Sequence, residues 1–210
     1  MVRVFTISRG YTVYMGKDKF ENELLIKYAL PEDIWFHVEN LSSAHVYLRL
    51  KPEDNFKNIA LDLLKDCVQL VKYNSIKGSK QQKVSIIYTP ASNLLKKKGM
   101  QAGEVAYKNY NLQKRIKNVQ KDSEILRRIK KTETEMSVDV LKKEKESKAQ
   151  EIKTEAKLKE LKAQKEKEEE EKRKNEEKEK KEKYEKEMEK YKVSNQEMDM
   201  TFEEFEDDFM

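Results

Sequence analysis

The chain has 210 residues, of which 40% are charged and 37% hydrophobic, and its formal net charge is +5. This composition is too polar for one globule that fills the whole chain, so we expect one domain with an appendage. No stretch approaches the roughly 18 apolar residues of a membrane-spanning helix, and the first residues turn polar too soon for a signal peptide. Cys67 is the only cysteine, which excludes an internal disulfide and favours a reducing compartment.

The charge is distributed unevenly along the chain. Residues 1–110 carry a net charge of +6 and residues 111–165 carry +7, whereas residues 166–192 carry −1 and residues 193–210 carry −7. The overall value therefore hides a strongly basic front and an acidic end. This asymmetry indicates a polyanionic partner.

Short strand and helix patterns alternate over residues 1–110. Arg3–Ile7 and Tyr11–Met15 predict a hairpin, and Lys19–Tyr28 predicts a helix that must end before Pro31. The elements predicted after them are strands at Ile34–Val38 and Ala44–Leu50, an amphipathic helix at Phe56–Asn74, and strands at Val84–Tyr88 and Val105–Tyr107, the last closing the sheet. Together they predict an α+β domain with a compact, antiparallel-rich sheet and about two packed helices.

A long charged helical arm is predicted for residues 111–192, because no glycine or proline follows residue 103. Within Asn111–Thr132 the apolar residues form one helical stripe, which could pack on the domain or on a partner helix. Beyond it Glu repeatedly precedes Lys by four positions, as in Glu170–Lys174, which stabilises a single helix in water. A coiled-coil dimer is the alternative, although apolar a and d positions are missing. Residues 193–210 are acidic and are expected to be disordered when unbound.

The most unusual local cluster contains the only tryptophan and both histidines. Alternation along a strand places Asp33, Trp35 and His37 on one face, and Ser43 and His45 follow closely. An indole can stack on a base, and a carboxylate or imidazole can bond base edges or sugars, so these five residues are candidate nucleic-acid ligands. The spacing equally fits a core tryptophan with structural histidines, and both interpretations stay open.

Metal binding and catalysis are disfavoured. Two histidines and an aspartate could ligate zinc, but there is no H-E-x-x-H or C-x-x-C motif and no second cysteine. A nucleophile elbow and a phosphate-binding loop of the Walker type are also missing from the sequence. We therefore predict no enzyme activity and no cofactor.

Basic residues supply the second candidate site. Lys96, Lys97 and Lys98 precede Gly99 in a predicted loop, and Lys17 follows Gly16 at the end of the first hairpin. Lysines beside glycine can approach phosphates closely, and neutralising phosphates releases counterions. Further basic residues lie before the Val84 strand and in the arm: Lys77, Lys80, Lys83, Lys114, Arg115, Lys117, Lys121, Arg127, Arg128, Lys130 and Lys131. A lysine loop is often only a solubilising surface, but together these residues predict one basic face.

Several spaced segments resemble the NFACT-R domain family, the RNA-binding module of ribosome quality control factors. They are Tyr14–Asp18, Glu21–Glu23, Pro31–His37, Ser43–Val46 and Val84–Thr89, with the lysine loop to Gly99. The string Asp33–Leu50 and the tip Phe205–Met210 are similar to the stand-alone members of the family. The resemblance implies contact with tRNA or rRNA in stalled large-subunit complexes, through Asp33, Trp35, His37, Ser43 and His45. It does not imply peptide elongation, because the large factors carry further domains that this sequence does not show.

The leading hypothesis is a non-enzymatic accessory protein that binds RNA on or near the ribosome, in the cytoplasm. DNA is an alternative ligand, because phosphate contacts do not distinguish the sugar. Lysine runs can also serve nuclear import, which keeps the nucleus open as a location. A scaffold that joins protein partners through the C-terminal helix is the third hypothesis.

Overall fold

The structure is a computed structural model that describes the backbone of residues 1–207 and the side chains of residues 1–186 and of Met188. The chain divides into two units, one that spans Met1–Ala149 and one from Gln150 onward. No helix in the described part of the chain is long and apolar enough to cross a membrane.

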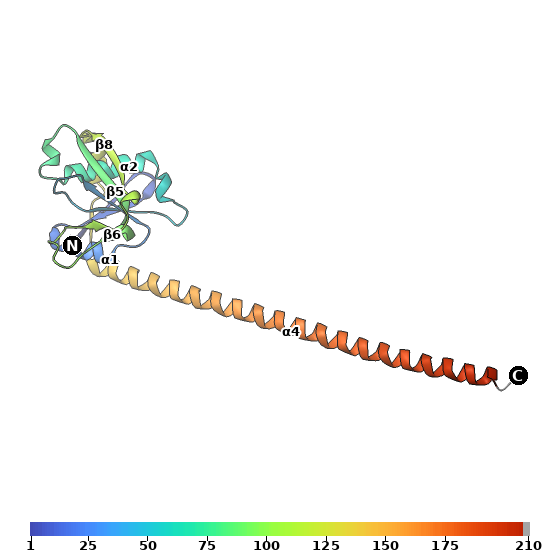
Figure 1. The fold of residues 1–210 in the computed structure, drawn as a ribbon. Coiled ribbons are helices and arrows are strands. Elements are labelled where there is room, and N and C mark those ends of the chain that lie inside the picture. The colour runs from blue at the N-terminus through green and yellow to red at the C-terminus, as the bar shows by residue number, and fades with distance from the viewer. Residues whose placement is uncertain (208–210) are drawn as a thin grey trace. The chain divides into compact units, whose positions relative to one another are not determined.

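A seven-stranded antiparallel sheet forms the centre of the first unit, in the order β8-β5-β3-β4-β2-β1-β9 (Figure 1). Its strands are β1 (Val2–Thr6), β2 (Thr12–Met15), β3 (Asp33–Val38), β4 (Val46–Arg49), β5 (Val84–Pro90), β8 (Lys114–Val119) and β9 (Thr134–Met136). A separate two-stranded ribbon pairs β6 (Leu94–Leu95) with β7 (Ala106–Tyr107). The predicted α+β fold with an antiparallel sheet is confirmed, and so is the hairpin of β1 and β2.

Alternation along the strands divides the core into two layers. Ile34 and Phe36 belong to the cluster in which α2 (Leu61–Tyr73) packs, and α3 (Ser123–Lys130) packs beside α2. We call this side of the sheet the α2 side. Trp35 belongs to the other cluster, with α1 (Lys19–Tyr28) and the β6–β7 ribbon, and we call that side the α1 side.

The helix α1 begins and ends as its sequence dictates. The carboxylate of Asp18 accepts hydrogen bonds from the backbone N–H groups of Phe20 and Glu21, at 2.8 and 3.0 Å. This N-cap satisfies donors that the first turn leaves free. The helix ends at Tyr28, and Ala29 takes an extended ψ of 142° ahead of Pro31, as predicted.

The predicted helix over residues 111–132 is wrong. Residues 114–119 form β8, which pairs with β5 at the edge of the sheet, and only Ser123–Lys130 is helical. Ile116 packs into the α2-side core from β8, so its spacing reflects a strand whose register shifts opposite β5. An open sheet edge therefore outweighs the local helical pattern, because strand preference depends on the partner strand and on burial. The predicted last strand is also misplaced, since β7 pairs with β6 and not with the main sheet.

The last element is α4, which spans Val138–Asp207 and confirms the long charged C-terminal helix. Its first turns belong to the compact unit, where Leu141 is buried and Glu144 bonds Arg49 at 2.9 Å. Beyond Gln150 the described side chains are exposed, and Glu170 pairs with Lys174 at 2.7 Å as expected. The backbone of α4 enters the segment 193–210, which we expected to be disordered. The side chains of residues 193–210 and the backbone of residues 208–210 lie outside the described part of the structure.

Candidate nucleic-acid interface

Asp33 and Trp35 share one face of β3 as predicted, but both side chains are sealed inside the protein, at 0% and 1% exposure. Asp33 accepts hydrogen bonds from the hydroxyl of Tyr14 at 2.6 Å, from the N–H of Leu30 at 2.7 Å and from Nε of Arg49 at 2.6 Å. The prediction that Asp33 and Trp35 contact nucleic acid is wrong for the folded chain, because the α1-side layer covers them.

The two histidines complete this interior cluster. His37 stacks on Trp35, and His45 meets both rings edge-on, each at a centroid distance of 5.3 Å. Burial lowers the pKa of His37 and lowers that of His45 to about 3, where the charge of His37 adds to the effect. His45 is 2% exposed and therefore cannot act as a ligand, whereas His37 keeps partial access to solvent.

Ser43 has a structural role in the turn before β4. Its hydroxyl accepts a hydrogen bond from the N–H of Val38 at 3.0 Å and donates one to the carbonyl of Ala44 at 3.2 Å. These bonds connect the end of β3 to the approach to β4. Of the five residues that the strand pattern nominated, only His37 and Ser43 retain some exposure.

The lysine loop is only partly available. Lys96 donates to Glu23 at 2.5 Å and to the carbonyls of Gln101 and Glu104 at 2.6 and 3.0 Å, so its charge holds the loop against α1. Lys97 and Lys98 are exposed on this α1 side, as is Lys17.

Arg127 and Arg128 lie on the opposite side of the sheet, on α3. Arg128 is engaged with Asp66 at 2.6 Å and with Ser8 at 2.9 Å, while Arg127 is exposed. The predicted single basic face that joins Lys96–Lys98 with Arg127 and Arg128 is therefore wrong. The sheet separates the two groups, because α1 and the loop cover one face and α2 and α3 cover the other.

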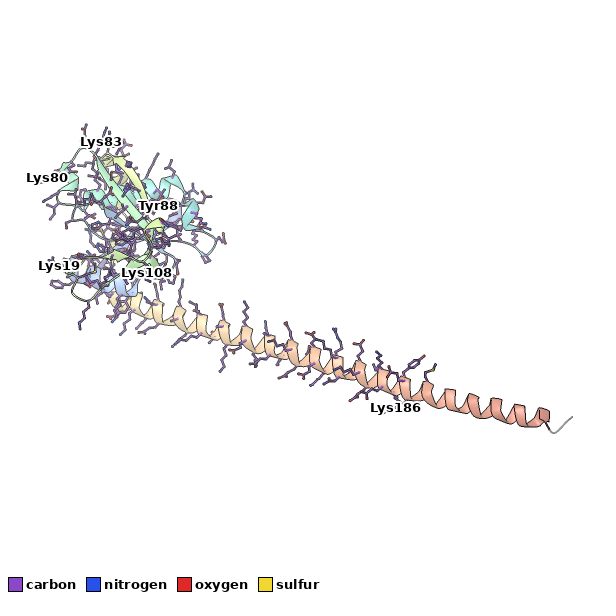
Figure 2. All side chains as sticks on the ribbon, viewed as in Figure 1. Lys19, Lys80, Lys83, Tyr88, Lys108 and Lys186 are labelled. Carbon is purple, nitrogen blue, oxygen red and sulfur yellow. The ribbon has the colours of Figure 1, made fainter. Side chains whose placement is uncertain are left out.

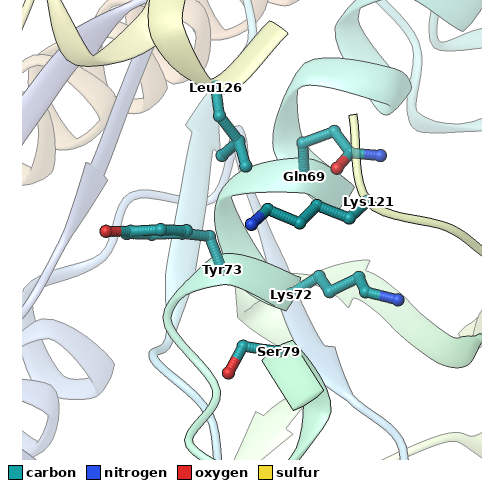
Figure 3. Close-up of a pocket in the computed structure, with 6 residues that line it drawn as sticks. All are labelled: Gln69, Lys72, Tyr73, Ser79, Lys121 and Leu126. Atoms are coloured by element: carbon teal, nitrogen blue, oxygen red, sulfur yellow. The ribbon is translucent and has the colours of Figure 1, made fainter. Parts of the chain in front are cut away.

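A hollow of about 390 Å³ lies between α2, α3 and the segments around them (Figure 3). It is lined by Gln69, Lys72, Tyr73, Ser79, Lys121 and Leu126. In Figure 3 the side chain of Lys121 extends toward Tyr73, whereas the end of Lys72 is directed away from the ring. The residues come from the end of α2, the loop after it, the segment between β8 and α3, and α3 itself.

Lys72 fixes a positive charge in the wall of this hollow. Its side chain is 2% exposed, and its ammonium donates to the carbonyls of Gln81, Gln82 and Val119 at 3.0, 2.9 and 2.9 Å. No carboxylate pairs with it among the described residues. Burial lowers the pKa of Lys72, as expected for a cation without a counter-charge.

Positive charge also surrounds Tyr73 at the rim. Lys130 donates to the phenol oxygen at 2.5 Å and lies 3.9 Å from the ring centroid. Lys130 lowers the pKa of Tyr73, and the more distant charges of Lys121 and Arg3 act in the same direction. Lys77, Lys80 and Lys83 lie in the loop that supplies Ser79, and Figure 2 shows Lys80 and Lys83 at one end of the compact unit, away from Lys19 and Lys108.

Besides the lysines already named, a further sequence signal marks this region. Between Asp66 and Asp122 the chain contains 12 lysines and arginines but only one acidic residue, Glu104. The bond from Lys72 to Val119 joins the two ends of that stretch beside the hollow. A count of acidic residues in a sliding window would have identified this stretch as the basic part of the domain.

The described residues contain no group of three or more His, Cys, Asp or Glu side chains that could hold a metal ion. The geometry instead provides lysines, an exposed aromatic ring and a hollow. A family model described as the NFACT protein RNA binding domain matches residues 1–109. The chain belongs to this family.

Three relatives of this NFACT RNA-binding domain protein match it over stretches of similar length. The chain is 53% identical over 135 residues to the coiled-coil domain-containing protein 25 homolog of Dictyostelium discoideum, covering 64% of this chain and 66% of that protein. It is 49% identical over 144 residues to coiled-coil domain-containing protein 25 of Bos taurus, covering 69% of each. Protein JLP2 of Saccharomyces cerevisiae is 42% identical over 132 residues, covering 61% of this chain and 64% of that protein.

A solved structure shares the fold. The C-terminal part of the fibronectin/fibrinogen-binding protein from Streptococcus suis superposes with a TM-score of 0.51 at 23% identity, over 61% of this chain and 49% of that one. The family supports an RNA-binding, non-enzymatic role, while the relatives' names specify no further function. The family match includes Lys77, Lys80 and Lys83 and ends before Lys121.

Proposed function

We propose that this chain is an RNA-binding accessory protein whose compact unit contacts the RNA through a basic surface on the α2 side. The basic surface comprises the hollow together with Lys77, Lys80, Lys83, Lys121 and Lys130. The observation that carries the proposal is the meeting of two lysine-rich stretches, free of acidic residues, around an open hollow. The family description supports RNA as the ligand.

The charges of the basic surface are available to a ligand. The side chains of Lys77, Lys80, Lys83 and Lys121 make no hydrogen bond or ion pair with other described residues. By contrast, Arg3, Arg9, Lys96, Arg115 and Arg128 elsewhere on the compact unit each pair with a carboxylate. Unpaired lysines that neutralise phosphates release counterions, which makes the expected binding strong at low salt and steeply salt-dependent.

We infer that the RNA is ribosomal or transfer RNA, and this part of the proposal rests on the resemblance to ribosome quality control factors. Lysine–phosphate contacts alone favour RNA and DNA alike. A competition experiment between an RNA and the DNA of the same sequence therefore belongs to the test. Stronger competition by DNA would make DNA the ligand of the same surface.

The test compares two variants that lose the same charge on opposite sides of the sheet. Lys77→Gln, Lys80→Gln and Lys121→Gln together remove three unpaired charges from the basic surface. Lys17→Gln, Lys97→Gln and Lys98→Gln together remove three exposed charges from the α1 side. Fluorescence anisotropy of a labelled RNA across a salt series measures the affinity and its salt dependence for each.

The basic-surface variant is expected to bind more weakly. The negative slope of log affinity against log salt is expected to become shallower by about 2, because each lost phosphate contact removes roughly 0.7 from the magnitude of the slope. The α1-side variant is expected to keep the slope of the unmodified chain. The reverse pattern would place the interface on the lysine loop, and equal small losses in both would leave the binding non-specific.

A further inference from the structure

The hollow in the basic surface offers more enclosed space than contact with a phosphate backbone requires. Lysines on a flat surface suffice to track a polynucleotide chain, whereas a volume of about 390 Å³ falls within the range of pockets that hold small ligands. The shape therefore indicates that part of the ligand enters the protein.

The lining combines three kinds of chemistry. Tyr73 is 39% exposed and offers an aromatic ring, and Leu126 adds an apolar side chain. Lys121 adds a cation that makes no ion pair with the described residues, and Ser79 adds a hydroxyl, whose one bond among them is to the nearby carbonyl of Ile76 at 3.3 Å. A ligand with a flat aromatic group next to a negative charge satisfies all of them.

Lys72 makes the hollow selective for negative charge without contacting the ligand. Its three N–H donors are each used by a carbonyl oxygen, so none remains for a ligand. No carboxylate compensates its charge among the described residues. The charge therefore adds a positive potential at the wall of the hollow, which favours an anion there.

Tyr73 is held in a fixed orientation for stacking. Lys130 approaches the ring to 3.9 Å from its centroid and bonds its hydroxyl, and the same side chain of Tyr73 lines the hollow. In Figure 3 Tyr73 borders the space between Leu126 and the loop that carries Ser79. Stacking of a base on an aromatic side chain tolerates any base, because each has a π face.

We propose that the hollow binds one unpaired nucleotide of the RNA, with its base stacked on Tyr73 and its phosphate paired with Lys121. This inference rests on the RNA-binding function proposed above. A base in a helix is stacked and paired, so it enters a pocket only after it is flipped out of the stack, which costs free energy. The pocket therefore favours a loop, a bulge or a single-stranded end over a fully paired helix.

The experiment measures the affinity of the full chain for two RNA probes of equal length, an unstructured oligonucleotide and a blunt, fully paired duplex. Tyr73→Ala is expected to weaken binding of the unstructured RNA by about ten-fold, the effect of losing one stacked base. The same substitution is expected to leave duplex affinity unchanged, because lysine–phosphate contacts remain. Tyr73→Phe keeps the ring and loses only the hydroxyl bond to Lys130, so its loss of affinity for the unstructured RNA is expected to be smaller than that of Tyr73→Ala.

Equal affinity changes for both probes, or no loss for the unstructured RNA, would overturn the nucleotide pocket. In that event the basic-surface variant would still bind less RNA than the α1-side variant, and the proposed function would stand. Absence of RNA binding by the unmodified chain would overturn both. The duplex affinity of Tyr73→Ala also reports that this variant is folded.

Discussion

Replacing Asp33 with alanine is expected to lower the free energy of unfolding by about 3 to 5 kcal/mol. The carboxylate is fully buried and accepts hydrogen bonds from Tyr14, Leu30 and Arg49, all at 2.6 to 2.7 Å. Its removal leaves a buried hydroxyl and a buried N–H without an acceptor, and it removes the main partner of a half-buried guanidinium.

Urea unfolding followed by the fluorescence of Trp35 measures this loss, because Trp35 is the only tryptophan and is 1% exposed. Glu53→Ala is the control, since Glu53 is an exposed carboxylate and its removal is expected to change stability by less than about 0.5 kcal/mol. RNA affinity of folded Asp33→Ala should equal that of the unmodified chain. A loss below about 1 kcal/mol together with weaker RNA binding would return Asp33 to the list of ligands.

Acidification is expected to destabilise the compact unit through His45. The folded chain holds the pKa of His45 at about 3, while the unfolded chain restores about 6.5. Below pH 6.5 His45 is therefore protonated in the unfolded state but stays neutral in the folded state, and stability falls as the pH drops from about 6.5 to about 3. The resulting loss in the free energy of unfolding amounts to roughly 4 to 5 kcal/mol at the low end of that pH range.

The measurement is the free energy of unfolding between pH 3 and pH 7 for the unmodified chain and for His45→Gln. Carboxylates contribute acid sensitivity to both proteins, so the difference between the two curves isolates the histidine. The unmodified chain should lose more stability on acidification than the variant. Parallel curves would mean that His45 accepts a proton in the folded state. His37→Gln serves as a second comparison, because burial shifts the pKa of His37 in the same direction.

The strand pattern predicted which residues share a face but not what covers that face. Trp35 packs in a buried cluster with Leu25 of α1 and Leu94 of β6, while the partners of buried Asp33 are Tyr14, Leu30 and Arg49. Those covering residues are distant in sequence, and no local period encodes their position. For the same reason the spacing alone fits both a set of exposed ligands and an interior cluster.

The edge of the sheet and the hollow were unpredictable for a related reason. Ile116 fits a helical stripe until β5 provides a partner strand from another part of the chain. Tyr73 and Lys121 line one hollow although almost fifty residues separate them. Lys72 lies within an amphipathic helix, where a lysine is expected to reach solvent, but three backbone carbonyls hold it inside. Composition predicted a basic domain, and only the tertiary structure shows which of its charges gather around the hollow.

Ultraviolet crosslinking of RNA to the full chain, followed by mass spectrometry of the attached peptides, tests the location of the interface most directly. Crosslinks are expected in residues 72–83 and 114–130, which flank the hollow, with Tyr73 foremost among the modified side chains. Crosslinks confined to residues 17–30 and 96–110, on the other side of the sheet, would contradict the basic surface proposed here.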